Sequence, residues 1–176
     1  GDPREIALRY EIANAPHASS NSASSLSRPH DPPVRIVDIK LLHSGKAAKR
    51  FSIHDDITAE ITIETKRPQP VQMNFFVLKA DGTYLAGVNS TKTLGDEYVP
   101  KEGRQSFQFV LQKGQLVKGE YTVGVGIYTL GYVPEIIDIL DKNYSNEPNE
   151  LIIVDKSLNK DGSFYLQGDW LASKNK

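Results

Sequence analysis

The stretch that decides the fold is ITAEITIET at residues 57–65. Apolar and polar residues alternate in it without interruption, which is the period of a β-strand with one buried side and one solvent-facing side. We expect Ile57, Ala59, Ile61 and Ile63 to point inward, and the outward positions are Thr58, Glu60, Thr62 and Glu64. The segment therefore predicts β structure on both sides of it.

Segments of the same kind surround this strand. They cover residues 34–42, 71–79, 83–90, 104–111, 121–128, 150–156 and 163–170. Turn signals separate them, and Asp81-Gly82 is a typical hairpin turn. Seven to eight short strands at regular spacing predict an all-β, immunoglobulin-like antiparallel sandwich. The chain has no cysteine, which excludes the disulfide that many such sandwiches contain.

Three segments depart from the β pattern. Residues 3–13 predict a short helix, because Pro3 suits a first helical turn after the capping residue Asp2. Residues 14–33 are rich in serine and proline and predict a flexible linker. PEIIDILDKNY at 134–144 predicts a short helical insertion, since a proline precedes closely spaced isoleucines. The expected organisation is a remnant helix of a preceding domain (1–13), a linker (14–33) and a sandwich domain (34–172).

Composition and motifs favour a binding domain over an enzyme. The net charge of −1 gives no general attraction to nucleic acid, so we expect no nucleic-acid partner. The glycines at 124 and 126 lack the third glycine of a dinucleotide fingerprint, and no P-loop is present. His54-Asp55-Asp56 reads as a solvated turn, because three adjacent residues lack the spacing of a metal site. We therefore expect no catalytic residues, no metal and no cofactor.

The outward positions of three predicted strands suit a carbohydrate. On the parity of the alternation they carry Asn74, Phe76, Tyr128, Tyr165 and Gln167. Aromatic rings stack on the apolar face of a sugar, and amides pair with its hydroxyls. Gly124 and Gly126 are expected to leave the sheet shallow enough for a groove. Packing of the rings under a loop or at a dimer contact is an equal alternative.

Asn89, Arg104 and Trp170 are three further candidates for the same site. Asn89 and Arg104 flank one loop, where Asn89 can bond sugar hydroxyls and Arg104 can hold an anionic group. An ordinary surface role is the alternative for both. Trp170 shares its parity with Phe164 and Leu166, which favours packing in the core or at an edge over ligand stacking.

The order of the segments resembles the C-terminal carbohydrate-binding domain of Wzt-type ATP-binding subunits, which export bacterial O-antigen polysaccharide. DGTYLAGVNS (81–90), GEYTVGVGIY (119–128) and GSFYLQGDW (162–170) carry the resemblance. The start, GDPREIALRYEI, also looks like the last helix of such a subunit's nucleotide-binding domain. The resemblance implies non-catalytic recognition of the modified non-reducing end of the O-antigen polysaccharide, coupled to its export.

The resemblance also implies partners and a location. It implies a cytoplasmic subunit at the inner membrane of a Gram-negative bacterium, joined to a membrane-spanning transporter subunit through its N-terminal domain. It further implies a homodimer, with the C-terminal strand as the element that two copies can exchange. An immunoglobulin-like protein-interaction or adhesion domain remains the alternative, and an accessory domain of a carbohydrate-processing enzyme is a third.

Overall fold

The structure is a computed structural model and describes residues 28–95, 97–141, 149–154 and 168–172. The elements in chain order are β1 (Val34–His43), β2 (Lys46–Ala47), β3 (Arg50–Ser52), β4 (Ile57–Thr65), β5 (Val71–Lys79), β6 (Tyr84–Asn89), α2 (Thr91–Leu94), β7 (Gly103–Leu111), β8 (Gly119–Thr129), β9 (Ile136–Leu140), β10 (Asn149–Val154) and β11 (Gly168–Ala172).

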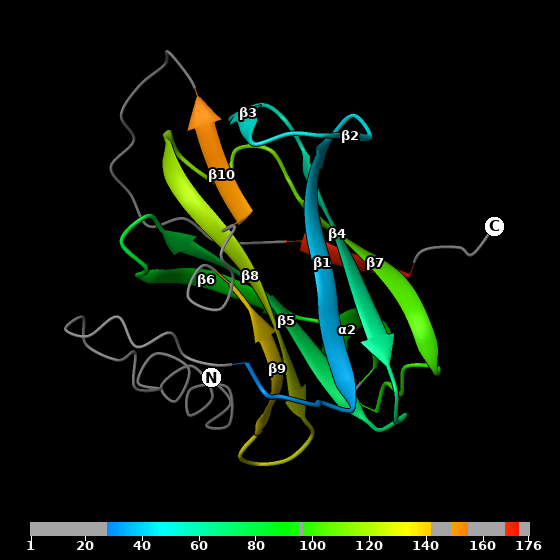
Figure 1. The fold of residues 1–176 in the computed structure, drawn as a ribbon. Coiled ribbons are helices and arrows are strands. Elements are labelled where there is room, and N and C mark those ends of the chain that lie inside the picture. The colour runs from blue at the N-terminus through cyan, green and yellow to red at the C-terminus, as the bar shows by residue number, and fades with distance from the viewer. Residues whose placement is uncertain (1–27, 96, 142–148, 155–167, 173–176) are drawn as a thin grey trace.

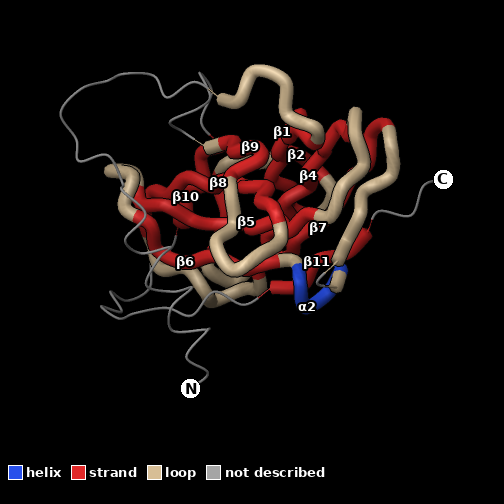
Figure 2. The backbone as a smooth tube through the Cα atoms, turned by 90° about the horizontal axis from the view of Figure 1, so that it is seen from below, coloured by secondary structure: helices blue, strands red, loops and turns tan. Residues whose placement is uncertain are grey.

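The strands form two sheets that pack face to face (Figures 1 and 2). The first sheet has the order β11-β7-β4-β1-β2, and the second has the order β3-β10-β8-β5-β6, with β9 paired to β8. Neighbouring strands are antiparallel except β10 and β3, which are parallel. The predicted all-β sandwich is confirmed.

The core lies between the two sheets and follows the alternation of the sequence. Ile57, Ala59, Ile61 and Ile63 of β4 are buried as expected, and the polar residues between them are half-buried. Phe75 of the second sheet stacks on Phe109 of the first, with ring centroids 4.3 Å apart and an interplanar angle of 22°. Each sheet therefore contributes one apolar side to a common core.

A β-bulge in β1 keeps two charged residues out of this core. The pairing of β1 with β4 shifts register between Ile36 and Asp38. Without the shift, strict alternation would turn Asp38 and Lys40 inward after Ile36. The extra residue reverses the parity, so that Ile39 is buried instead.

The helical insertion predicted at 134–144 is wrong. Residues Ile136–Leu140 form strand β9, which pairs with residues 125–128 of β8. The isoleucine-rich run has high β propensity, and pairing with β8 outweighs the weak helical spacing that the sequence indicated. Within the described residues, a short helix lies elsewhere, at Thr91–Leu94.

Other boundaries differ from the expectations at the ends of the chain. The last strand was expected at 163–170, and the described strand β11 covers Gly168–Ala172, where its backbone pairs with β7. In this pairing Trp170 lies opposite Phe109 on the outermost strand of the first sheet. The short strands β2 and β3 were not predicted. The predicted helix 1–13 and linker residues 14–27 lie outside the described residues.

Candidate functional site

Several predicted binding residues lie on one face of the second sheet. Phe75 and Val125 point into the core, so the alternate residues lie on the opposite face. The register places Asn74 opposite Asn89 of β6 and Gly126 of β8. We call this surface the outer face. The members that we consider are Gln72, Asn74, Phe76, Tyr84, Gly87, Asn89, Gly124, Gly126 and Tyr128.

Side-chain amides on the outer face are held by hydrogen bonds. Asn89 donates from Nδ2 to Gln72 Oε1 at 3.0 Å, and its Oδ1 accepts a bond from the backbone N–H of Thr91 at 2.9 Å. Gln72 in turn donates from Nε2 to the carbonyl of Thr129 at 3.4 Å. Gln72 and Asn89 are both half-buried. They are therefore oriented before any ligand arrives, which lowers the entropy cost of binding.

Aromatic rings occupy the space above the glycines of this face. A Cβ at Gly124 would come closer than 3.0 Å to the ring of Phe76, and one at Gly126 would come to 2.5 Å from Tyr128 Oη. The glycines were expected to leave a shallow groove. The structure corrects this expectation, because the neighbouring rings fill the space that the missing side chains leave.

On β6, the side chain of Tyr84 likewise occupies the space beside a glycine, Gly87. The hydroxyl of Tyr84 lies where a Cβ at Gly87 would be, and the Tyr84 hydroxyl is hydrogen-bonded to Asn74. Burial raises the pKa of Tyr84 above its ordinary value, and the bond from Asn74 opposes this in part. The Tyr84 ring also lies 6.1 Å from that of Phe76, centroid to centroid. The outer face thus has a layer of packed side chains.

Accessibility divides the predicted residues of this face. Phe76 is only 5% exposed and Asn74 only 9%, so these two side chains mainly support the layer. Tyr128 and Asn89 are half-buried and reach the surface. A ligand that approaches this face would meet Gln72, Asn89 and Tyr128 before it met Phe76.

The remaining predicted residues are not brought to this group by the described structure. Arg104 belongs to β7 of the first sheet, where its side chain is 69% exposed and its Nε lies 3.6 Å from Glu64 Oε1. Tyr165 and Gln167 lie outside the described residues. The described part of the site therefore consists of Asn74, Phe76, Asn89 and Tyr128.

Sequence reasoning missed three members of the outer face, which are Gln72, Tyr84 and Gly87. Gln72 has the same parity as Asn74 and could have been found from it. Tyr84 was hidden because the pairing of β5 and β6 shifts register between Val77 and Leu78. A bulge of this kind leaves no clear mark in the sequence.

The acidic residues of the His54-Asp55-Asp56 turn have structural partners. Asp55 Oδ2 accepts a bond from the backbone N–H of Ser52 at 2.8 Å, and Asp56 Oδ1 accepts one from that of Lys113 at 2.9 Å. In the described part of the chain, no group of three or more His, Asp or Glu side chains is arranged to hold a metal ion. None of the described helices is long and apolar enough to cross a membrane.

One hollow lies away from the outer face, at an end of the sandwich. It encloses only about 10 Å³ and is lined by residues that include Ser52, Ile57, Leu111, Leu116 and Ile153. Sites for drug-sized molecules usually measure roughly 300–1,000 Å³. The exposed sheet surface is therefore the better candidate for a ligand.

Comparisons with known proteins support one family. Residues 27–145 match the model of the Wzt C-terminal domain, which is more than half of the chain. Among solved structures, the C-terminal domain of Wzt is similar with a TM-score of 0.62 and 17% identity, over 78% of this chain and 82% of that one. A putative beta-galactosidase from Bacteroides fragilis is similar with a TM-score of 0.46 and 15% identity, over 76% of this chain and 20% of that one. No curated protein matches the sequence at a significant level. The match to the family model, over a fold shared with a solved member, shows that this chain belongs to the Wzt C-terminal domain family, which is a non-catalytic part of an O-antigen transporter subunit.

Proposed function

We propose that this domain binds the modified non-reducing end of an O-antigen polysaccharide and so couples completion of the chain to its export. Family membership supports a role in polysaccharide transport. The observation that carries the choice of surface is the group of amides and phenol rings on the outer face. Gln72, Asn89 and Tyr128 are half-buried there, and Asn74 lies beneath them.

The chemistry of this group suits a sugar residue. The ring of Tyr128 offers an apolar surface and a hydroxyl, and the amides of Gln72 and Asn89 offer donors and acceptors at its side. Few groups take part, and a flexible polysaccharide loses conformational freedom when it binds. We therefore expect weak affinity, with a Kd of about 1 μM or above. Tyr165 and Gln167 remain proposed members of the same site.

The proposal includes the assembly around the domain. The domain would act at the cytoplasmic side of the inner membrane of a Gram-negative bacterium, as part of a subunit that pairs with a membrane-spanning subunit. Two copies would form a homodimer. Exchange of the C-terminal strand β11 is the proposed mode, because among the described residues β11 is the outermost strand of the first sheet and pairs only with β7.

The direct test is a titration of the 176-residue chain with O-polysaccharide that carries or lacks its terminal modification. Calorimetry should detect binding of the modified form. Tyr128→Ala should weaken that binding at least about tenfold, which corresponds to about 1.4 kcal/mol. Glu60→Ala is the matched control, because Glu60 lies on β4 of the other sheet and is also half-buried.

The outcomes distinguish an error in the choice of surface from an error in the proposed function. Normal binding by Tyr128→Ala together with weakened binding by Glu60→Ala would move the site to the first sheet. Absence of binding to both polysaccharide forms by the parent chain would refute the proposed function. Thermal unfolding of each variant shows whether a loss of binding reflects a loss of folded protein.

A protein partner is the second candidate, and one feature of the structure favours it. The hairpin between β8 and β9 exposes three large apolar side chains: Tyr132 is 83% exposed, Val133 67% and Ile136 53%. Exposed apolar groups that lie close together often mark a protein contact. Tyr132→Ser combined with Val133→Ser should leave glycan binding unchanged, whereas a protein contact through the hairpin would be weakened by the same change.

A further inference from the structure

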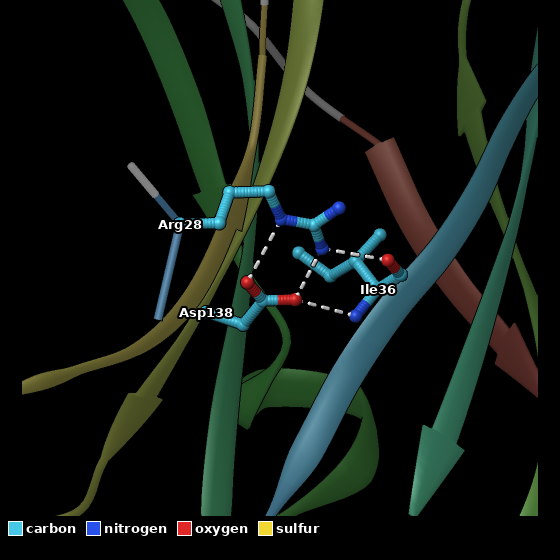
Figure 3. A network of polar contacts seen from close by, with 3 residues as sticks. All are labelled: Arg28, Ile36 and Asp138. Carbon is cyan, nitrogen blue, oxygen red and sulfur yellow. Dashed lines mark hydrogen bonds and ion pairs between the residues drawn. The ribbon is translucent and has the colours of Figure 1, made fainter. Parts of the chain in front are cut away.

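A buried carboxylate joins the two sheets to the segment that precedes β1. Asp138 of β9 is completely buried, and its Oδ2 accepts a bond from the backbone N–H of Ile36 in β1 at 2.7 Å. The Arg28 guanidinium donates from Nε to Asp138 Oδ1 at 3.1 Å and from Nη2 to Oδ2. The same Nη2 donates to the carbonyl oxygen of Ile36 at 2.7 Å. Figure 3 shows the carboxylate between the guanidinium and the backbone of Ile36.

This arrangement satisfies both backbone groups of Ile36. The N–H binds a carboxylate and the C=O binds a guanidinium, which are the two bonds that a neighbouring strand would normally supply. Such a substitute is needed at this point, because β2 pairs with β1 only at Leu42 and His43. The ion pair therefore closes the part of the β1 edge where, among the described residues, no strand is paired.

The ion pair is buried enough to matter energetically. The Asp138 side chain is 0% exposed and the Arg28 side chain 17% exposed. Two charges in such a site are costly to separate, because removing one leaves the other without a partner in a poorly solvated place. Exposed ion pairs of the same chain, such as Lys66 with Asp31, have both side chains in contact with water and contribute much less.

A second contact holds the other end of the same short segment. The carbonyl of Pro33 accepts bonds from the backbone N–H groups of Lys66 at 2.9 Å and Arg67 at 3.2 Å. Residues 28–33 are thus attached at Arg28 to β9 of the second sheet and at Pro33 to the end of β4 in the first sheet. The segment bridges the two layers of the sandwich.

We propose that residues 28–33 form a strap whose closure depends on the Arg28–Asp138 pair. In the closed state the strap completes the edge of β1 and fixes the point at which the chain leaves the sandwich toward its N-terminus. Opening the pair would release that point and free the backbone groups of Ile36 together. Movement of the preceding chain would then change the position of β9. Ile136 of β9 pairs with Tyr128 of the outer face, so the change would be transmitted to that face.

Hydrogen exchange of the 176-residue chain tests the strap. Arg28→Gln should raise the exchange rate of the amides in residues 34–37 at least about tenfold, because the edge opens more often when the buried pair is lost. Arg28→Lys should give a smaller increase, since one ammonium cannot reproduce the planar set of donors that a guanidinium directs to both Asp138 and the Ile36 carbonyl. Lys49→Gln is the control and should change these rates less than about twofold, because Lys49 forms an exposed ion pair with Glu150 that does not involve residues 28–33.

A double-mutant cycle distinguishes a strap from unrelated stabilising contacts. Arg28→Gln and Asp138→Asn should act through one interaction, so the double variant should exchange no faster than the faster-exchanging single variant, rather than at the product of both effects. Unchanged exchange at residues 34–37 in Arg28→Gln would overturn the proposal, and so would strictly multiplicative effects of the two changes. If Asp138→Asn does not fold, the comparison of Arg28→Gln with Arg28→Lys and Lys49→Gln decides alone.

Discussion

Replacing Gly124 by alanine tests the packed layer of the outer face. The added Cβ would lie closer than 3.0 Å to the ring of Phe76 and 2.8 Å from the Cβ of Asp141. Real Cβ atoms essentially never show such separations, so the ring or the strand must shift. Phe76 is only 5% exposed and has little room to move.

The expected cost follows from two opposing effects. Overpacking of a filled site typically costs about 1–3 kcal/mol. Alanine also restricts the unfolded chain more than glycine does, which returns about 0.4–1 kcal/mol. Gly124→Ala should therefore lower the free energy of unfolding by about 1–2 kcal/mol, and the melting temperature by about 3–6 °C for a domain of this size.

Two glycines of the same strand serve as comparisons. Gly126→Ala should cost less, because the ring that it meets belongs to Tyr128, which is half-buried and can rotate toward solvent. Gly119→Ala should also cost less than Gly124→Ala, since the three atoms nearest its Cβ, all in the side chain of Tyr121, would lie 3.1–3.2 Å away. Thermal and urea unfolding followed by circular dichroism would rank the three variants. A Gly124→Ala variant that melts within about 1 °C of the parent would refute the claim that Phe76 is held over Gly124.

Two further predictions concern stability. Phe109→Ala should cost about 3–5 kcal/mol in urea unfolding, because Phe109 is fully buried and stacks on Phe75 across the two sheets; a loss below about 1 kcal/mol would contradict the assigned core. Burial raises the pKa of Tyr84, Tyr98 and Tyr121 above the ordinary value of 10.0, so the folded state keeps these protons after the unfolded state has lost them. The stability that they contribute should be fully present below pH 10 and should fall as the pH rises through the folded pKa values, which thermal melts between pH 8 and 11 would detect, with Tyr84→Phe reducing the decline.

The sequence by itself determined most of the strands and which of their sides is buried. The alternation in residues 57–65 matches the observed burial of β4 residue by residue. The segment predicted at 71–79 has the same bounds as strand β5. Local pattern was sufficient here because a strand between two neighbours must place every second side chain in the core. The order of these segments also resembles that of the family to which the chain belongs.

Tertiary structure decided the features that depend on a partner distant in the sequence. Ile136–Leu140 became a strand because β8 offers it an edge, and Asp138 is buried because Arg28, 110 residues away, neutralises it. The rings of Phe76 and Tyr128 cover glycines that, read alone, predicted an open groove. Alternation states which side of a sheet a residue occupies, but only the packed fold decides what lies above it, because the ring that fills the space can come from another strand, as that of Phe76 does over Gly124.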